Sequence, residues 1–118
     1  MKNTRKPGAH FKFDVLGEGR FALAGCFGFP TVAAILGLSK TYFEKEPVIR
    51  LDLSGVTQSD SAGLALLLEW TNWALHYQRE IHFLEIPKQI LDIARISEVE
   101  GLLHSAERTR ANARTATA

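Results

Sequence analysis

The stretch from Leu51 to Leu68 reads LDLSGVTQSDSAGLALLL and decides the fold. Its first residues are typical of a buried strand, its middle is short and polar, and its apolar residues from Ser61 onward have helical spacing. The first turn of a helix leaves backbone N–H groups unpaired at the positive end of the helix dipole. The stretch therefore predicts a strand, a polar loop and a helix, with the Ser61 hydroxyl presented to solvent.

The flanking sequence continues this alternation of strands and helices. The expected strands are 11–16, 20–27, 48–53 and 81–86, the first two joined by a turn at 17–19. The expected helices run from Pro30 to about Phe43, from Ser61 to about Gln78 and from Pro87 to about Ile96, with a short strand or turn at 99–103. This order predicts an α/β fold: a mixed sheet of four to five strands, partly parallel, with its helices packed on one face.

Length and composition indicate one small domain. We expect a flexible N-terminus at 1–9, the folded domain at 10–103 and a disordered tail at 104–118, where apolar periodicity ends. The net charge of +1 argues against a nucleic-acid binder that works by broad phosphate neutralisation. The single cysteine, Cys26, fits a reducing compartment, and residues 1–7 lack the apolar stretch of a signal peptide. We therefore expect a cytoplasmic protein.

Residues 21–39 carry no charge and are long enough to span a bilayer. However, Gly25, Gly28 and Pro30 interrupt the run, and a proline in the middle would break a continuous helix. A strand followed by a helix explains the same residues better.

The sequence offers no pattern typical of an enzyme or a metal site. The four histidines are scattered without metal-ligand spacing, so we expect no metal and no cofactor. The Gly17-Glu18-Gly19 segment is a turn, since no Gly-Lys-Ser/Thr follows it as in a phosphate loop. No general base or nucleophile pair lies near Ser61, which favours a binding role over catalysis.

Asp60 and Ser61 are expected to act at the helix start. Either side chain accepts bonds from the first free N–H groups of a helix, a cap that contributes about 1 kcal/mol. One of the pair is then able to cap while the other faces a partner. Phosphate on Ser61 would be tolerated at the positive end of the dipole. Asp52 is expected to accept a local Asx-type bond.

The helix from Ser61 has two apolar faces at 100° per residue. The face predicted to be core comprises Leu64, Leu67, Leu68, Thr71, Ala74 and Leu75. The nearly opposite face comprises Leu66, Trp70, Trp73 and Tyr77. Either a neighbouring helix covers this second face, or it is an exposed aromatic patch of the kind that marks interfaces. We predict the latter, as one partner-binding surface continuous with Asp60 and Ser61.

The segments Asp52-Leu53-Ser54-Gly55-Val56 and Asp60-Ser61-Ala62-Gly63, followed by Leu-Ala-Leu-Leu, resemble the STAS family of sulfate transporters and anti-sigma-factor antagonists. The expected element order of residues 11–103 also resembles that fold. The resemblance implies a docking module without catalytic activity.

Two branches of the family imply different partners. Anti-sigma-factor antagonists usually have a phosphorylated serine directly before the glycine, where this chain has Ala62. Asp-Ser-Ala-Gly followed by Leu-Ala-Leu-Leu is similar to the MlaB-like STAS subunit of the Mla phospholipid ABC transporter. The resemblance thus implies binding to the transporter's cytoplasmic ATPase at the inner membrane. The alternatives are an antagonist that binds an anti-sigma-factor kinase, with Ser61 as phosphoacceptor, and a small lipid- or nucleotide-binding domain.

Overall fold

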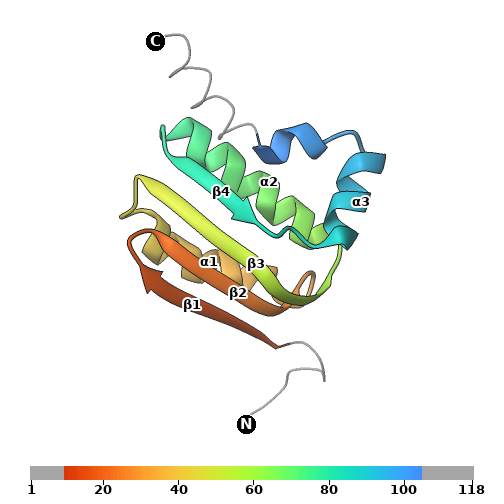
Figure 1. Ribbon diagram of the computed structural model, residues 1–118, viewed down its shortest axis with the longest axis horizontal. Coiled ribbons are helices and arrows are strands. Elements are labelled where there is room, and N and C mark those ends of the chain that lie inside the picture. The colour runs from red at the N-terminus through yellow and green to blue at the C-terminus, as the bar shows by residue number, and fades with distance from the viewer. Residues whose placement is uncertain (1–9, 105–118) are drawn as a thin grey trace.

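A computed structural model describes residues 10–104 of the chain (Figure 1). Within these residues, four strands form one sheet in the order β1-β2-β3-β4. The strands are β1 (Phe11–Gly17), β2 (Arg20–Phe27), β3 (Val48–Ser59) and β4 (Glu80–Leu84). The helices are α1 (Val32–Phe43), α2 (Ser61–His76) and α3 (Lys88–Ile96), followed by the 3-10 helix η1 (Glu100–His104).

The sheet is mixed, as the element order predicts. β1 pairs antiparallel with β2, whereas β2, β3 and β4 run parallel to one another. In Figure 1 both α1 and α2 lie behind the sheet. Leu51 and Leu53 of the central strand β3 are 0% and 1% exposed beneath them. The prediction of an α/β fold with its helices against one sheet face is confirmed.

The β1–β2 turn contains two residues, Glu18 and Gly19, whose φ angles are +57° and +76°. Two positive φ values are those of a type I′ turn, whose twist matches that of the strands it joins. Gly19 is also required by space, because a Cβ there would collide with the carbonyl oxygen of Val48. The turn thereby brings the hairpin against the beginning of β3.

β3 is longer than the sequence pattern predicts. The polar residues expected to form a loop after Leu53 continue as strand to Ser59 and pair with the second half of β2, as in Gly25↔Val56 and Phe27↔Ser59. The register shifts twice, and at the first shift a Cβ on Gly55 would lie 2.8 Å from Cβ of Ala24. Most side chains of this segment are exposed at the rim of the sheet, which is why they are polar. Its backbone pairs with that of β2 and so forms strand.

Two further boundaries differ from expectation. Helix α1 begins at Val32 rather than Pro30, because buried Thr31 intervenes and donates its hydroxyl to the carbonyl of Cys26 (2.9 Å). The segment 99–103, expected to be a short strand or a turn, is helical: Glu100–His104 forms a 3-10 helix that buries Leu103 to 2% exposure.

The uncharged run 21–39 divides between β2 and α1, as expected. In the described part of the chain, no helix is long and apolar enough to cross a membrane.

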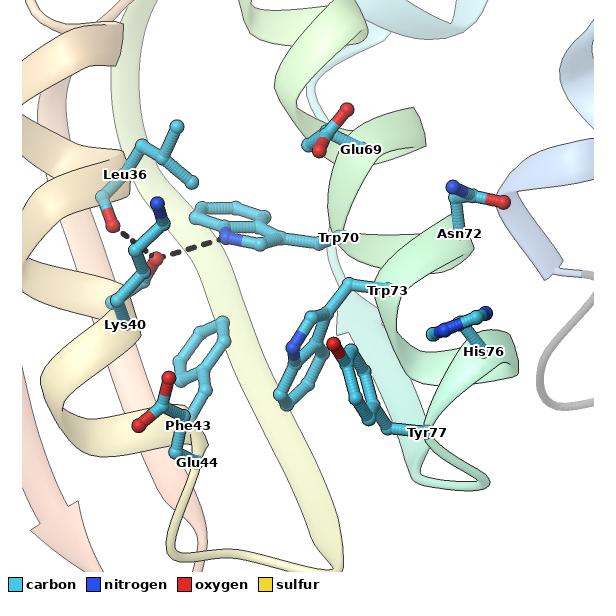
Figure 2. Close-up of a pocket in the computed structure, with 11 residues that line it drawn as sticks. Leu36, Lys40, Phe43, Glu44, Glu69, Trp70, Asn72, Trp73, His76 and Tyr77 are labelled. Atoms are coloured by element: carbon cyan, nitrogen blue, oxygen red, sulfur yellow. Dashed lines mark hydrogen bonds between the residues drawn. The ribbon is translucent and has the colours of Figure 1, made fainter.

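The prediction that Leu66 and Trp70 belong to an exposed patch is wrong. They are 5% and 2% exposed, because α1 lies beside α2 on the same sheet face. The Trp70 indole N–H donates to Oγ of Ser39 on α1 (3.0 Å), as Figure 2 shows. Its ring lies 5.4 Å from that of Phe43 and 6.1 Å from that of Phe27. The neighbouring helix therefore covers this part of the second face.

The buried face of α2 is consequently wider than one stripe. Its buried residues, from Leu66 round to Leu64, cover an arc of about 160° at helical spacing. Leu75, predicted to be core, lies at one rim of this arc and is 40% exposed. Trp73 lies at the other rim and is half-buried. A helix packed against both a sheet and a second helix needs apolar residues on both flanks.

We expect Trp70→Ala to lower the free energy of unfolding by about 3–5 kcal/mol, because it empties a fully packed site and leaves Ser39 without its donor. Tyr77→Ala, at a side chain that is 58% exposed, should cost less than about 1 kcal/mol. Urea denaturation of the two variants measures both values, and equal losses would contradict the arrangement.

Candidate docking site at the start of helix α2

Asp60 is the N-cap of α2. Its Oδ1 accepts from the backbone N–H groups of Ala62 (2.9 Å) and Gly63 (3.4 Å). Its backbone is extended, with φ −154° and ψ −168°, before the helix begins at Ser61. The capping prediction for Asp60 is confirmed. Because Asp60 makes the cap bonds, the Ser61 side chain is not needed to cap the helix.

The second carboxylate oxygen of Asp60 bonds a different part of the chain. Oδ2 accepts from the backbone N–H of Phe29, 31 residues earlier and in the segment between β2 and α1 (3.0 Å). Gly28 makes this approach possible, because a Cβ there would lie 2.7–2.8 Å from the carboxylate atoms. One carboxylate thus ties the end of β2 to the start of α2, a long-range contact that sequence spacing did not reveal.

Gly63 provides the second close approach at this point. A Cβ on Gly63 would lie 2.5 Å from the carbonyl oxygen of Phe27 and 3.3 Å from Cδ1 of Ile90. The first turn of α2 therefore rests directly on the end of β2 and against α3. The Asp-Ser-Ala-Gly motif thus has a structural basis in two residues, the capping carboxylate and the glycine.

Ser61 lies between these two residues and is exposed. Within residues 10–104 its hydroxyl makes no hydrogen bond, so it is available as both donor and acceptor. It also lies at the end of α2 where the helix dipole is positive. The prediction that the helix start presents a free hydroxyl to solvent is confirmed; its role in contacting a partner stays a prediction.

Phe29 is the residue of this site that the sequence analysis missed. Its side chain is 82% exposed although its backbone is held by Asp60. In the sequence it falls within the uncharged run 21–39 and looks like core. Its position directly before Pro30, which disfavours helical backbone, was the available sign that it lies outside both β2 and α1.

The third side of the site is α3. Oγ of Ser59, at the end of β3, donates to Oε1 of Gln89 in the first turn of α3 (3.2 Å). On the exposed side of the same helix, a hydrogen bond from Lys88 lowers the pKa of Asp92. Three segments therefore meet at the first turn of α2: the β2–α1 connection, the end of β3 and the start of α3.

Asp52 does not belong to this convergence. Its Oδ1 accepts from the N–H of Ser54 two residues on (2.9 Å), the Asx-type bond expected for it, at the register shift between β2 and β3. Its role is local to the strand.

Trp73 and Tyr77 line a separate groove of about 420 Å³ between α1 and α2, whose lining side chains Figure 2 shows. Lys40 of α1 and Glu44, directly after α1, line one side, and Glu69 and His76 of α2 line the other. Twelve residues of helix, about 18 Å, separate Trp73 from Ser61, and Leu66 and Trp70, predicted to connect them, are buried. The predicted single surface from Ser61 to Tyr77 is therefore wrong.

The described residues contain no group of three or more histidine, cysteine or acidic side chains placed to hold a metal ion. The start of α2 presents a free hydroxyl at a helix N-terminus, and the segment bonded to Asp60 carries the exposed Phe29 side chain.

A family model described as "Mlab, STAS domain" matches residues 15–104. The chain therefore belongs to the STAS domain family, in its MlaB type, a family that is generally non-catalytic. No curated protein matches the chain.

We expect Asp60→Asn to keep the helix but to release Phe29. Asparagine caps as well as aspartate through its carbonyl oxygen, whereas its amide group is unable to accept from the Phe29 N–H. Hydrogen exchange should therefore quicken at the Phe29 amide while the amides of α2 stay protected. Unchanged exchange at Phe29 would contradict the bond between the two segments.

Proposed function

We propose that this chain is a non-catalytic subunit that binds the cytoplasmic ATPase of an Mla-type phospholipid ABC transporter and supports its assembly and activity. It would thereby maintain the lipid asymmetry of the outer membrane. The observation that carries the proposal is the exposed Ser61 hydroxyl at the start of α2 in an MlaB-type domain, directly after Asp60, whose carboxylate also holds the backbone of the exposed Phe29.

The surface around Ser61 has the chemistry of a protein interface. Phe29 provides an apolar anchor of the kind that concentrates binding energy when it enters a partner's pocket. Ser61 provides a donor and an acceptor, and the positive end of α2 favours a carboxylate or carbonyl group of the partner. Because Asp60 fixes both segments, little ordering cost remains to be met on binding.

Trp73 and Tyr77 supply a second contact in this proposal, at the far end of α2. Tyr77 is 58% exposed, and Trp73 lies beneath it with ring centroids 6.0 Å apart. A partner large enough to cover α2 would reach both ends of the helix. Leu66 and Trp70 have no part in it, since they are core.

In this proposal the chain is cytoplasmic, and it lies at the inner membrane only because it binds the transporter. It requires no cofactor, metal or nucleic acid.

Ser61→Glu should sharply reduce the amount of ATPase that co-purifies with the chain. A carboxylate is tolerated at the helix N-terminus, so the fold survives, but a charge is introduced into the centre of the interface. Phe29→Ala should weaken co-purification as well, through loss of the anchor. The matched control is Ser54→Glu, which adds the same charge at an exposed serine on β3. Full co-purification of both site variants would refute the proposal.

A second candidate is an antagonist that binds an anti-sigma-factor kinase and is released by phosphorylation. The exposed Ser61 hydroxyl, free of hydrogen bonds within residues 10–104, favours it, since a kinase needs such access. Against it, the position before Gly63 is Ala62, which has no hydroxyl.

Intact mass after incubation with the cognate kinase and ATP distinguishes the two candidates. The antagonist gains one phosphate that is lost in Ser61→Ala, whereas the transporter subunit gains none.

A further inference from the structure

The outer edge of β1 is the feature from which we draw a further inference. β1 is the last strand of the sheet, and in Figure 1 it runs along the outside of the molecule. Residues 11–15 pair with β2 in unbroken register, and the irregularity comes only after Val15. A straight edge strand of this kind is a template for pairing with another chain unless it is interrupted or covered.

The direction of the β1 backbone groups follows from one hydrogen bond. The N–H of Cys26 donates to the carbonyl of His10 (2.7 Å), in register with the pairs Phe11↔Gly25 and Phe13↔Leu23. In an antiparallel pair, successive residues alternate between bonding the neighbour and pointing away from it. Lys12 and Asp14 therefore bond β2, and the N–H and C=O groups of Phe13 and Val15 point to the outer edge.

The side chains of β1 divide between the two sheet faces. Phe13 lies on the helix side, where its ring is 5.7 Å from that of Phe21 and 6.1 Å from that of Tyr42, yet it is only half-buried. Val15, on the same side, is 50% exposed. Lys12 and Asp14 lie on the opposite face, with their charged atoms 3.9 Å apart. The apolar layer of the core thus continues, partly uncovered, to the edge.

This segment, Phe-Lys-Phe-Asp-Val, is complementary to itself when two copies pair antiparallel. A residue whose backbone groups point outward has to face a residue of the other copy that also points outward. The two-fold axis therefore passes through a residue, and not between two residues. A centre at Lys12 places two lysines opposite each other, and a centre at Asp14 places two aspartates opposite each other. A centre at Phe13 places Lys12 of each copy opposite Asp14 of the other. Like charges directly opposite are destabilising and unlike charges stabilising, so electrostatics select the centre at Phe13.

We propose that the occupant of this edge is a second copy of the chain, paired β1 to β1 about a two-fold axis at Phe13, so that two sheets form one. Lys12 and Asp14 then form two cross-chain ion pairs in the closely spaced, non-hydrogen-bonded positions. On the helix side, Phe13 meets its own copy and Val15 meets Phe11, which extends the apolar layer across the junction. This surface shares no residue with the Ser61 site, so the failure of one proposal leaves the other untouched.

Charge reversal on the full-length chain tests this pairing. The native chain should show a concentration-dependent dimer in sedimentation equilibrium between micromolar and near-millimolar concentration. In the Lys12→Asp variant an aspartate faces an aspartate at both ion-pair positions of the dimer. In the Asp14→Lys variant a lysine faces a lysine at both positions. Each variant should weaken self-association about tenfold or more. Both side chains are exposed, at 74% and 43%, so thermal melting should stay close to native.

Restoring the complementarity should restore the dimer. The double variant Lys12→Asp/Asp14→Lys should self-associate again, and the two single variants, each weak alone, should pair when mixed. The matched controls are Lys88→Asp and Asp92→Lys on α3, an ion pair of similar exposure (86% and 41%) away from β1; they should dimerise as the native chain does.

A native chain that stays monomeric across that range would overturn the proposal. So would single variants that associate like the native chain, or a mixture of the two that remains monomeric.

Discussion

The carboxylate of Asp60 makes the hydrogen bonds on which the arrangement of β2, α1 and α2 around Ser61 depends. It accepts three backbone N–H groups, two from the first turn of α2 and one from Phe29. Hydrogen bonds to an ionised acceptor are about twice as strong as neutral ones. Because the donors come from segments 31 residues apart, the end of β2 and the start of α2 are held as one unit. The glycines at 28 and 63 leave the space that this approach requires.

The position of α1 decides which parts of α2 are available to a partner. α2 packs against the sheet on one flank and α1 on the other, and Trp70 fills the space between them with its indole N–H bonded to Ser39. The remaining exposed strip, which includes Ala65, Glu69 and Asn72, is mostly small or polar. The apolar side chains that remain exposed therefore lie away from the middle of α2, as at Phe29, Tyr77 and Val15.

Much of the fold followed from local pattern. The Gly-Glu-Gly turn between two apolar runs predicted the β1–β2 hairpin, and proline and apolar spacing placed the helices to within about two residues at their starts. The Asp-Ser pair predicted both a cap and an exposed hydroxyl at Ser61. The end of β3 was not predictable in this way, because Ser54 to Ser59 have loop composition and become strand only since β2 continues beside them.

The sequence by itself determined the order of elements, the capped start of α2 and the membership of the family, because each is written in contiguous residues: turn chemistry, helical period and a motif with fixed spacing. The tertiary structure decided which apolar side chains are covered. The amphipathic pattern indicates that Trp70 is covered, but it does not say which element covers it. The uncharged run around Phe29 predicts a core residue, whereas its side chain is 82% exposed. Whether a side chain is buried depends on the residues packed around it. Trp70 is covered by α1 and the backbone of Phe29 is held by Asp60, and in both cases the partner is about 30 residues away in the chain.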